Sequence, residues 1–374
     1  MIISKLTIPR RSNNPGRAFL ALASFLISSS LVFAQPREVS AVPPDKGPPD
    51  SEERTTMTRL QIFLDRANFR PGKIDGLGGE FTQKALDRYN QVNGKRQGEL
   101  PDLASVPNAY REYVITEEDA KWVGPLARSP AEQEKLKALP YSDLWELVAE
   151  KFHCSLNFLH ELNPQPSDLK VNDTVKVPDA PEFAMADVVT LEKQRRDEKK
   201  QKEQAAKAAA AAASASPSAS PDALATPTPT ATPTPTPAPP RYHLILLRPE
   251  RLIEVYEGEK MVACVPCTPG SKEVPVPTGT WKVTSNILMP YYRWDKSVLE
   301  SGKRSENSFN LPPGPNNPVG IVWMGINRPS VGIHGTTSPD QIGRNESHGC
   351  IRTANWDAFL LSQMIEKGTQ VEVR

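Results

Sequence analysis

The sequence predicts a protein of several small domains that ends in a mostly β domain. The chain has 374 residues, enough for two or three domains. Its 38 prolines lie largely between segments with apolar periodicity, a texture typical of compact modules joined by extended stretches. In the last third, short runs of apolar and β-branched residues separated by Gly and Pro indicate strands.

The overall charge excludes two classes of partner. The chain carries 45 basic and 44 acidic residues, so no net field attracts nucleic acid or an anionic membrane.

The N-terminus has the pattern of an export signal over residues 1–34. A basic leader precedes the apolar run 18–33, and small or apolar residues allow cleavage after Ala34. The alternative is an uncleaved membrane anchor, but the run is short for a span and contains four serines. We therefore expect a mature protein without a stable membrane span, located in the periplasm or cell wall.

The four cysteines are too few for a disulfide scaffold, even in an oxidising compartment. Cys264 and Cys267 form a C-x-x-C pair, but a structural zinc site would need two further ligands at similar spacing. We therefore expect two half-buried thiols or one local disulfide, and no metal.

A helical module is expected over residues 55–100, after a flexible leader of residues 35–54. Two helical patterns flank turn residues, and a plain structural bundle is one interpretation. The segment also resembles the peptidoglycan-binding-domain family of small helical modules, which implies wall binding. The residues that carry this resemblance are Leu60, Gln61, Pro71, Gly72, Asp75, Gly76, Gly79 and Thr82.

A second module is expected over residues 136–180. Two short helical patterns precede a strand pattern that ends at Pro178. The segment resembles a LysM module, which implies a βααβ fold that binds N-acetylglucosamine polymers. The matching residues are Asp143, Leu144, Trp145, Leu147, Ala149, Asn163, Pro164, Val177 and Pro178. The first strand is left open, and His153 and His160 are interpreted as packing or surface residues.

Residues 184–240 are expected to be a linker. Residues 192–213 are Ala-rich with charges of alternating sign, which predicts a solvated helix. The proline-rich tract that follows would extend roughly 75 Å at about 3.1 Å per residue. We therefore expect the N-terminal modules to hold wall polymer and to be dispensable for the chemistry.

The C-terminal domain, residues 241–374, contains one cluster of reactive residues. Strand patterns are followed by a single convincing helix over residues 354–368. His334 and Cys350 are 16 positions apart, and the pair offers a base that works near neutral pH and a strong nucleophile. Gly349 permits a tight backbone where amide N–H groups converge on an oxyanion. Each residue alone is usually structural, whereas the combination indicates nucleophilic catalysis.

These residues resemble the L,D-transpeptidase (YkuD-like) family. Its signature appears as His334-Gly335-Thr336 followed by Ser347-His348-Gly349-Cys350-Ile351-Arg352. The segments 277–281 and 312–320 are similar to further family motifs. The resemblance implies a β-sandwich catalytic domain and ping-pong acyl transfer on peptidoglycan stem peptides with release of D-Ala. It implies no metal or organic cofactor, and it implies inhibition by carbapenem-type β-lactams.

The resemblance also implies a role for each matching residue. Cys350 is the nucleophile, His334 is the general base, and the Gly335 carbonyl orients His334. The amides of Gly349 and Cys350 form the oxyanion hole, Ser347 and His348 shape the site, and Arg352 and Thr336 contact substrate.

Two other functions stay open at this point. One is a secreted wall-binding protein whose catalytic-like domain is inactive. The other is an L,D-carboxypeptidase or cysteine peptidase of the cell wall, although papain-like wall hydrolases place Cys before His.

Overall fold

The computed structural model describes residues 47–214, 239–270, 275–297, 304–344 and 349–374. These residues fall within one compact unit. The expected signal segment 1–34 and most of the proline tract lie outside the described residues. Among the residues that are described, no helix is long and apolar enough to cross a membrane.

The C-terminal part is built on a nine-stranded sheet with the order β5-β4-β3-β13-β7-β10-β11-β12-β6. Most neighbours are antiparallel, while β3/β13 and β11/β12 are parallel. This confirms the mostly β prediction. The strands are β3 (Tyr242–Leu247), β4 (Leu252–Glu257), β5 (Lys260–Pro266), β6 (Thr268–Pro269), β7 (Gly279–Leu288), β10 (Val322–Ile326), β11 (Gly332–His334), β12 (Ile351–Arg352) and β13 (Gln370–Val373).

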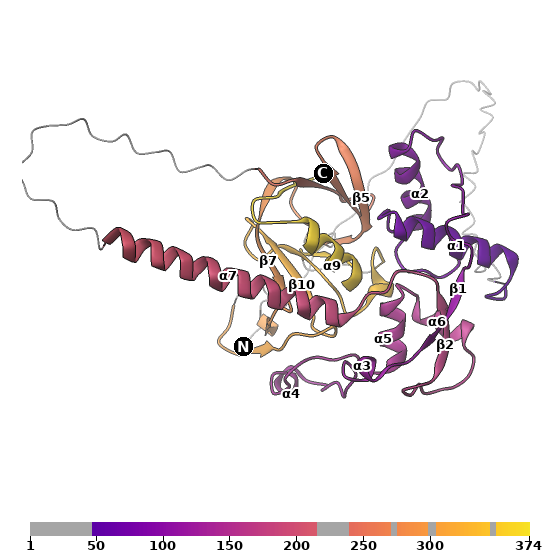
Figure 1. Cartoon of the computed structure of the whole chain (residues 1–374), viewed down its shortest axis with the longest axis horizontal. Coiled ribbons are helices and arrows are strands. Elements are labelled where there is room, and N and C mark those ends of the chain that lie inside the picture. Colours follow the sequence, from indigo (N-terminus) through magenta and orange to yellow (C-terminus); the bar gives the residue numbers. More distant parts are fainter. Residues whose placement is uncertain (1–46, 215–238, 271–274, 298–303, 345–348) are drawn as a thin grey trace, which may run out of the picture. The chain divides into compact units, whose positions relative to one another are not determined.

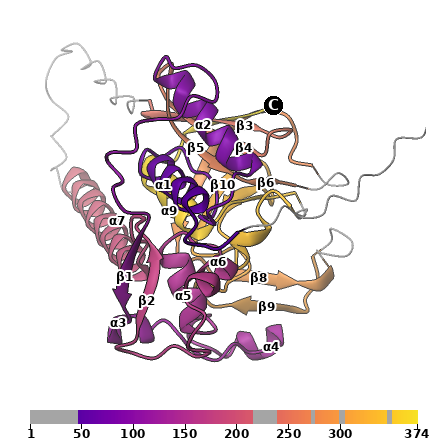
Figure 2. The same ribbon diagram turned by 90° about the vertical axis from the view of Figure 1, so that its right-hand side faces the viewer.

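Strand β7 connects the two halves of this sheet. Its first residues pair with β13, and its later residues pair with β10. The helix α9 (Asn355–Met364) packs against β10 and β11, beside the strands that carry the candidate site (Figure 1). A separate hairpin, β8 (Tyr292–Asp295) with β9 (Ser308–Leu311), contacts the short helix α4 (Pro130–Gln133) (Figure 2).

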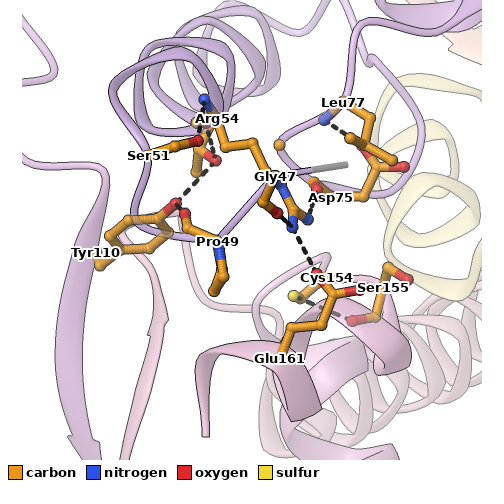
Figure 3. Close-up of polar contacts among 12 residues, drawn as sticks. Gly47, Pro49, Ser51, Arg54, Asp75, Leu77, Tyr110, Cys154, Ser155 and Glu161 are labelled. Carbon is orange, nitrogen blue, oxygen red and sulfur yellow. Dashed lines mark hydrogen bonds and ion pairs between the residues drawn. The ribbon is translucent and has the colours of Figure 1, made fainter. Parts of the chain in front are cut away.

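Two N-terminal helices, α1 (Glu52–Arg66) and α2 (Glu80–Val92), flank a loop whose shape is set by Gln61. Its side-chain amide donates to Asp75 Oδ1 at 3.0 Å and accepts from the Gly76 backbone N–H at 2.9 Å. Gly76 has a φ of +68°, a conformation that favours glycine. Figure 3 shows Arg54 of α1 donating to the Asp75 carbonyl and to Glu161. The loop is thereby tied to both α1 and the next module.

The second module contains α5 (Leu144–Lys151), α6 (Leu156–Leu162) and β2 (Thr174–Pro178). Its partner strand is β1 (Tyr110–Val114), which pairs antiparallel with the whole of β2 (Figure 1). This strand lies before residue 136, the boundary expected from the sequence. The intervening segment includes α3 (Glu117–Ala120) and α4, so the module is longer than its pattern indicated.

The segment expected to be a linker begins as part of the packed structure. Helix α7 (Met185–Ser214) starts with Met185 and Val188, both of which are buried. Further along, Arg195 donates to the Ser362 carbonyl at 2.7 Å and to Asn286 Oδ1 at 3.3 Å. The first turns of α7 are therefore docked on the C-terminal part. They carry buried apolar residues, and the Arg195 guanidinium donates to two oxygen atoms of that part.

The N-terminal helices also pack directly on the sheet. Leu60, Leu64 and Phe69 share one apolar cluster with Leu252 and Met261 of β4 and β5. Strand β5 is at one edge of the sheet, and its Cys264 exchanges backbone hydrogen bonds with the segment 68–70. The N-terminal segment thus satisfies backbone groups that an edge strand would otherwise leave exposed.

Candidate active site

The candidate site is centred on His334, the last residue of β11. His334 is 4% exposed and pairs across the antiparallel ladder with Trp323 of β10. The indole and imidazole rings stack with their centroids 5.6 Å apart. Trp323 was not identified from the sequence, where it is one apolar residue in a strand pattern.

The protonation state of His334 follows from its contacts. Its Nδ1 lies 2.7 Å from the Gly335 carbonyl oxygen. Since a carbonyl oxygen only accepts, Nδ1 carries the hydrogen and Nε2 keeps a lone pair. Burial lowers the pKa of His334 to about 4, with a smaller contribution from Arg352 in the same direction, against the opposing Gly335 hydrogen bond. The imidazole is therefore neutral near pH 7, with Nε2 able to accept a proton.

Cys350 immediately precedes β12, which runs parallel to β11. The register places Arg352 opposite His334, and residues two apart along a strand share a face. Arg352 therefore lies on the same face as His334, and the backbone N–H of Gly332, the first residue of β11, donates to the Cys350 sulfur. The Cys350 thiol is partly buried and donates to the Ser330 carbonyl at 3.4 Å.

Burial is the main influence on the protonation of Cys350. Burial raises the pKa of the Cys350 thiol, while the Gly332 backbone N–H and the Arg352 charge act in the opposite direction. Burial also lowers the pKa of Arg352. The site thus combines a neutral thiol with a neutral imidazole, a pair in which the imidazole can accept the thiol proton.

Two glycines next to these residues have conformations or surroundings that a side chain would disturb. Gly349 has a φ of +91°, in the left-handed region. A Cβ on Gly332 would lie 2.8 Å from the Trp323 ring. Glycine is therefore favoured both at the position before Cys350 and at the start of the neighbouring strand β11.

The remaining predicted residues fall into two groups. Ser347 and His348 lie outside the described residues. Thr336, expected to contact substrate, is buried, and its hydroxyl accepts from the Ser338 backbone N–H at 3.2 Å. In this structure its side chain supports the loop after His334.

Two further residues lie near the thiol and had no signal in the sequence beyond their strand or turn patterns. Ser330 supplies the carbonyl that accepts from Cys350 and has a φ of +62°, which is uncommon for a residue with a side chain. Tyr292 of β8 interacts electrostatically with Cys350. Burial is the main cause that raises the pKa of Tyr292, and Cys350 raises it further.

The other cysteines have different surroundings. Cys154, Cys264 and Cys267 are free and fully buried, rather than half-buried or joined in a disulfide. Burial raises the pKa of each of these thiols well above its ordinary value. No group of three or more potential metal ligands occurs among the residues that the structure describes.

Comparison with known proteins identifies the C-terminal part. Residues 241–373 match the family described as the L,D-transpeptidase catalytic domain, YkuD. The putative L,D-transpeptidase YkuD of Bacillus licheniformis is 26% identical over 132 residues, which is 35% of this chain and 65% of that protein. The putative L,D-transpeptidase YqjB of Bacillus subtilis is 35% identical over 100 residues, 25% of this chain and 49% of that protein.

Solved structures give matches of similar extent. An L,D-transpeptidase from Mycobacterium smegmatis has 18% identity and a TM-score of 0.30, covering 36% of this chain and 58% of that chain. A structure of the L,D-transpeptidase LdtMt1 in complex with imipenem also has 18% identity and a TM-score of 0.30, covering 36% and 60%. The chain thus spans less than two thirds of each of these relatives. Residues 241–373, which contain His334 and Cys350, match the L,D-transpeptidase catalytic domain family.

Proposed function

We propose that this protein is a peptidoglycan L,D-transpeptidase that works by cysteine acyl transfer. One observation carries the proposal: the neutral His334, with its Nδ1–H on the Gly335 carbonyl, ends the strand whose first residue, Gly332, donates its backbone N–H to Cys350. This arrangement leaves Nε2 as the proton acceptor for a thiol nucleophile. The family match of residues 241–373 supports the proposal. The substrate class that the resemblance implies is a tetrapeptide stem of peptidoglycan.

The reaction proceeds in two half-reactions. The Cys350 sulfur attacks the carbonyl after the L-centre of the third stem residue, and His334 Nε2 takes the thiol proton. The backbone N–H groups of Gly349 and Cys350 stabilise the oxyanion. His334 then returns the proton to the leaving nitrogen, D-Ala departs, and a thioester remains. An amine attacks the thioester, His334 takes the amine proton, and the new amide leaves as the thiol is restored.

The substrate carboxylate provides a role for Arg352. Its side chain lies on the same face as the imidazole, where it pairs with an anionic group of the stem. It also disfavours an imidazolium at His334, which keeps the base neutral before substrate binds.

The direct test uses the full chain with a purified disaccharide tetrapeptide and an amine acceptor such as a D-amino acid. Mass spectrometry should detect the product in which the acceptor replaces D-Ala. Cys350→Ala should abolish transfer, and His334→Ala should reduce it almost as severely, since each removes one partner of the proton transfer. Formation of the tripeptide product without incorporation of the acceptor would indicate a carboxypeptidase. Near-normal transfer by Cys350→Ala would exclude Cys350 as the nucleophile.

The same site should be acylated by a carbapenem. The strained ring presents a carbonyl to the thiol, and ring opening leaves a thioester whose mass equals protein plus intact drug. The adduct should map to Cys350 alone. An adduct on Cys264 or Cys267 would contradict the assignment of the nucleophile, and no adduct would favour the inactive-domain alternative.

We also propose export to the periplasm or cell wall and binding of wall polymer by residues 55–100 and 136–180. Cosedimentation of full-chain Cys350→Ala with insoluble peptidoglycan tests the binding without covalent capture. Retention no greater than that of an unrelated control protein would reject it. Fractionation of cells that express the tagged protein tests the location.

A further inference from the structure

A buried carboxyl from the N-terminal part contacts the catalytic part behind the candidate site. Glu150 of α5 is 5% exposed. Its Oε1 accepts from the Tyr141 hydroxyl at 2.6 Å, and the Asn355 side-chain amide donates to Oε1 at 3.0 Å and to Oε2 at 3.2 Å. Glu150 and Asn355 are 205 positions apart in sequence. A helix of the LysM-like module therefore holds the first residue of α9.

Asn355 is itself in tight contact with the backbone beside the base. Its Oδ1 accepts from the Ile321 backbone N–H at 3.3 Å. A Cβ built on either Gly320 or Gly335 would lie 2.1 Å from that same oxygen. The amide of Asn355 is thus wedged between two glycines, and its position determines where the backbone of Gly335 can lie.

Gly335 is the residue whose carbonyl accepts from His334 Nδ1 at 2.7 Å. The contacts therefore run without a gap from Glu150 through Asn355 and Gly335 to the imidazole. We propose that Glu150 is a positioning residue for the transfer reaction, acting through Asn355 and Gly335 to hold His334 as the Nδ1–H tautomer. This inference rests on the proposed role of His334 as the base.

The physical reason is the number of acceptors available to Asn355. Without the Glu150 carboxyl, the Asn355 Nδ2 group keeps only the Pro315 carbonyl, at 3.3 Å. A buried amide that loses an acceptor rotates or shifts to find another. Any such movement displaces the Gly335 carbonyl. Nδ1 of His334 then loses its acceptor, and the imidazole is no longer held as the Nδ1–H tautomer. The N-terminal part would then contribute to catalysis, contrary to the expectation that it is dispensable for the chemistry.

The choice of variants follows from the protonation state of the Glu150 carboxyl. Burial raises the pKa of Glu150 to about 8, and Glu146 adds to this, while hydrogen bonds from Tyr141 and Asn355 oppose it. The carboxyl is therefore largely protonated at neutral pH, and glutamine has nearly the same shape and an acceptor oxygen. Glu150→Gln should preserve the contact with Asn355, whereas Glu150→Leu should remove it.

Arg88 provides a matched control between the same two parts of the protein. It lies on α2, and its Nε donates to Glu254 Oε1 of β4 at 2.6 Å. Arg88→Leu thus removes a polar contact between the N-terminal and catalytic parts without touching Gly335 or Asn355. Thermal unfolding of all variants identifies a temperature at which each is folded.

Two measurements on the full chain then test the proposal. For Glu150→Leu, kcat should fall roughly 10-fold or more with KM within about twofold, because a displaced base slows chemistry more than binding. Glu150→Gln and Arg88→Leu should both stay within about twofold of wild type. Equal kcat in Glu150→Leu and Arg88→Leu would overturn the inference, as would a loss in Glu150→Gln as large as that in Glu150→Leu.

The second measurement does not depend on turnover. Nitrogen NMR of protein labelled at histidine reports the tautomer of each ring, with the His334 signal assigned from the spectrum of His334→Asn. Wild type should show the Nδ1–H form, and Glu150→Leu should show a mixture of tautomers. An unchanged tautomer in Glu150→Leu would overturn the inference. If wild type has this tautomer but no Cys350-dependent transfer, the proposed function fails instead.

Discussion

The low pKa of His334 predicts a specific pH dependence of stability. The imidazole titrates at about 4 in the folded protein, against its ordinary value of 6.5. Between these pH values the unfolded chain binds the proton that the folded chain excludes, so stability falls as pH falls. Above pH 6.5 the imidazole is neutral in both the folded and the unfolded chain, so its titration costs no stability there. Lowering the pH from about 7 to about 5 should cost roughly 2 kcal/mol of folding free energy through this residue alone.

The assay compares urea unfolding of wild type and His334→Asn at these two pH values. Asparagine keeps an N–H for the Gly335 carbonyl but does not titrate, so other ionisable groups contribute equally to both proteins. The wild-type protein should lose about 2 kcal/mol more than the variant. Parallel losses in the two proteins would refute the reasoning, because they would show that His334 has the same pKa in the folded and unfolded chains.

The same pKa sets the acid limit of catalysis. Because His334 stays neutral down to about pH 4, transfer should remain near its full rate at pH 5. A rate that falls with a midpoint near 6.5 would show that the base is solvated in the working enzyme.

Three further outcomes are expected. Gly335→Ala should destabilise the fold and abolish transfer, since its Cβ would lie 2.1 Å from Asn355 Oδ1; an unchanged melting temperature would show that this contact yields easily. The isolated segment 241–374 should melt at a lower temperature than the full chain or aggregate, because β5 loses the segment that pairs with its edge. Cooperative melting at the full-chain temperature would contradict that expectation. Only Cys350 should react rapidly with a thiol reagent in the native protein, since the other three cysteines are fully buried; rapid labelling of a second thiol would show that the interior opens.

The candidate site shows which features a short stretch of sequence can predict. The interval between His334 and Cys350 and the glycines beside them were sufficient to propose these two residues as the reactive pair, because the proposed chemistry depends on side-chain type and short-range backbone freedom. The strand patterns of the C-terminal part were sufficient to predict a mostly β domain, which the family match and the sheet support. The short motif could not indicate Trp323, because its role arises from pairing with His334 across a ladder.

The modular picture was less complete, for a related reason. Periodicity reports which face of an element is buried, but not what covers it. It could not place β1, whose partner β2 lies beyond four short helices, nor show that α7 begins docked on the C-terminal part. The proline-rich texture indicated separated modules, whereas the described residues share apolar clusters across the predicted boundary.

The sequence by itself determined the candidate reactive residues, their spacing, and the mostly β class of the C-terminal part. Tertiary structure alone decided the state of those residues. The neutral state of His334 depends on burial, its tautomer depends on the Gly335 carbonyl, and the contact from Glu150 to Asn355 joins residues 205 positions apart. Burial and long-range hydrogen bonds are properties of the packed chain as a whole, so no local window of sequence contains them.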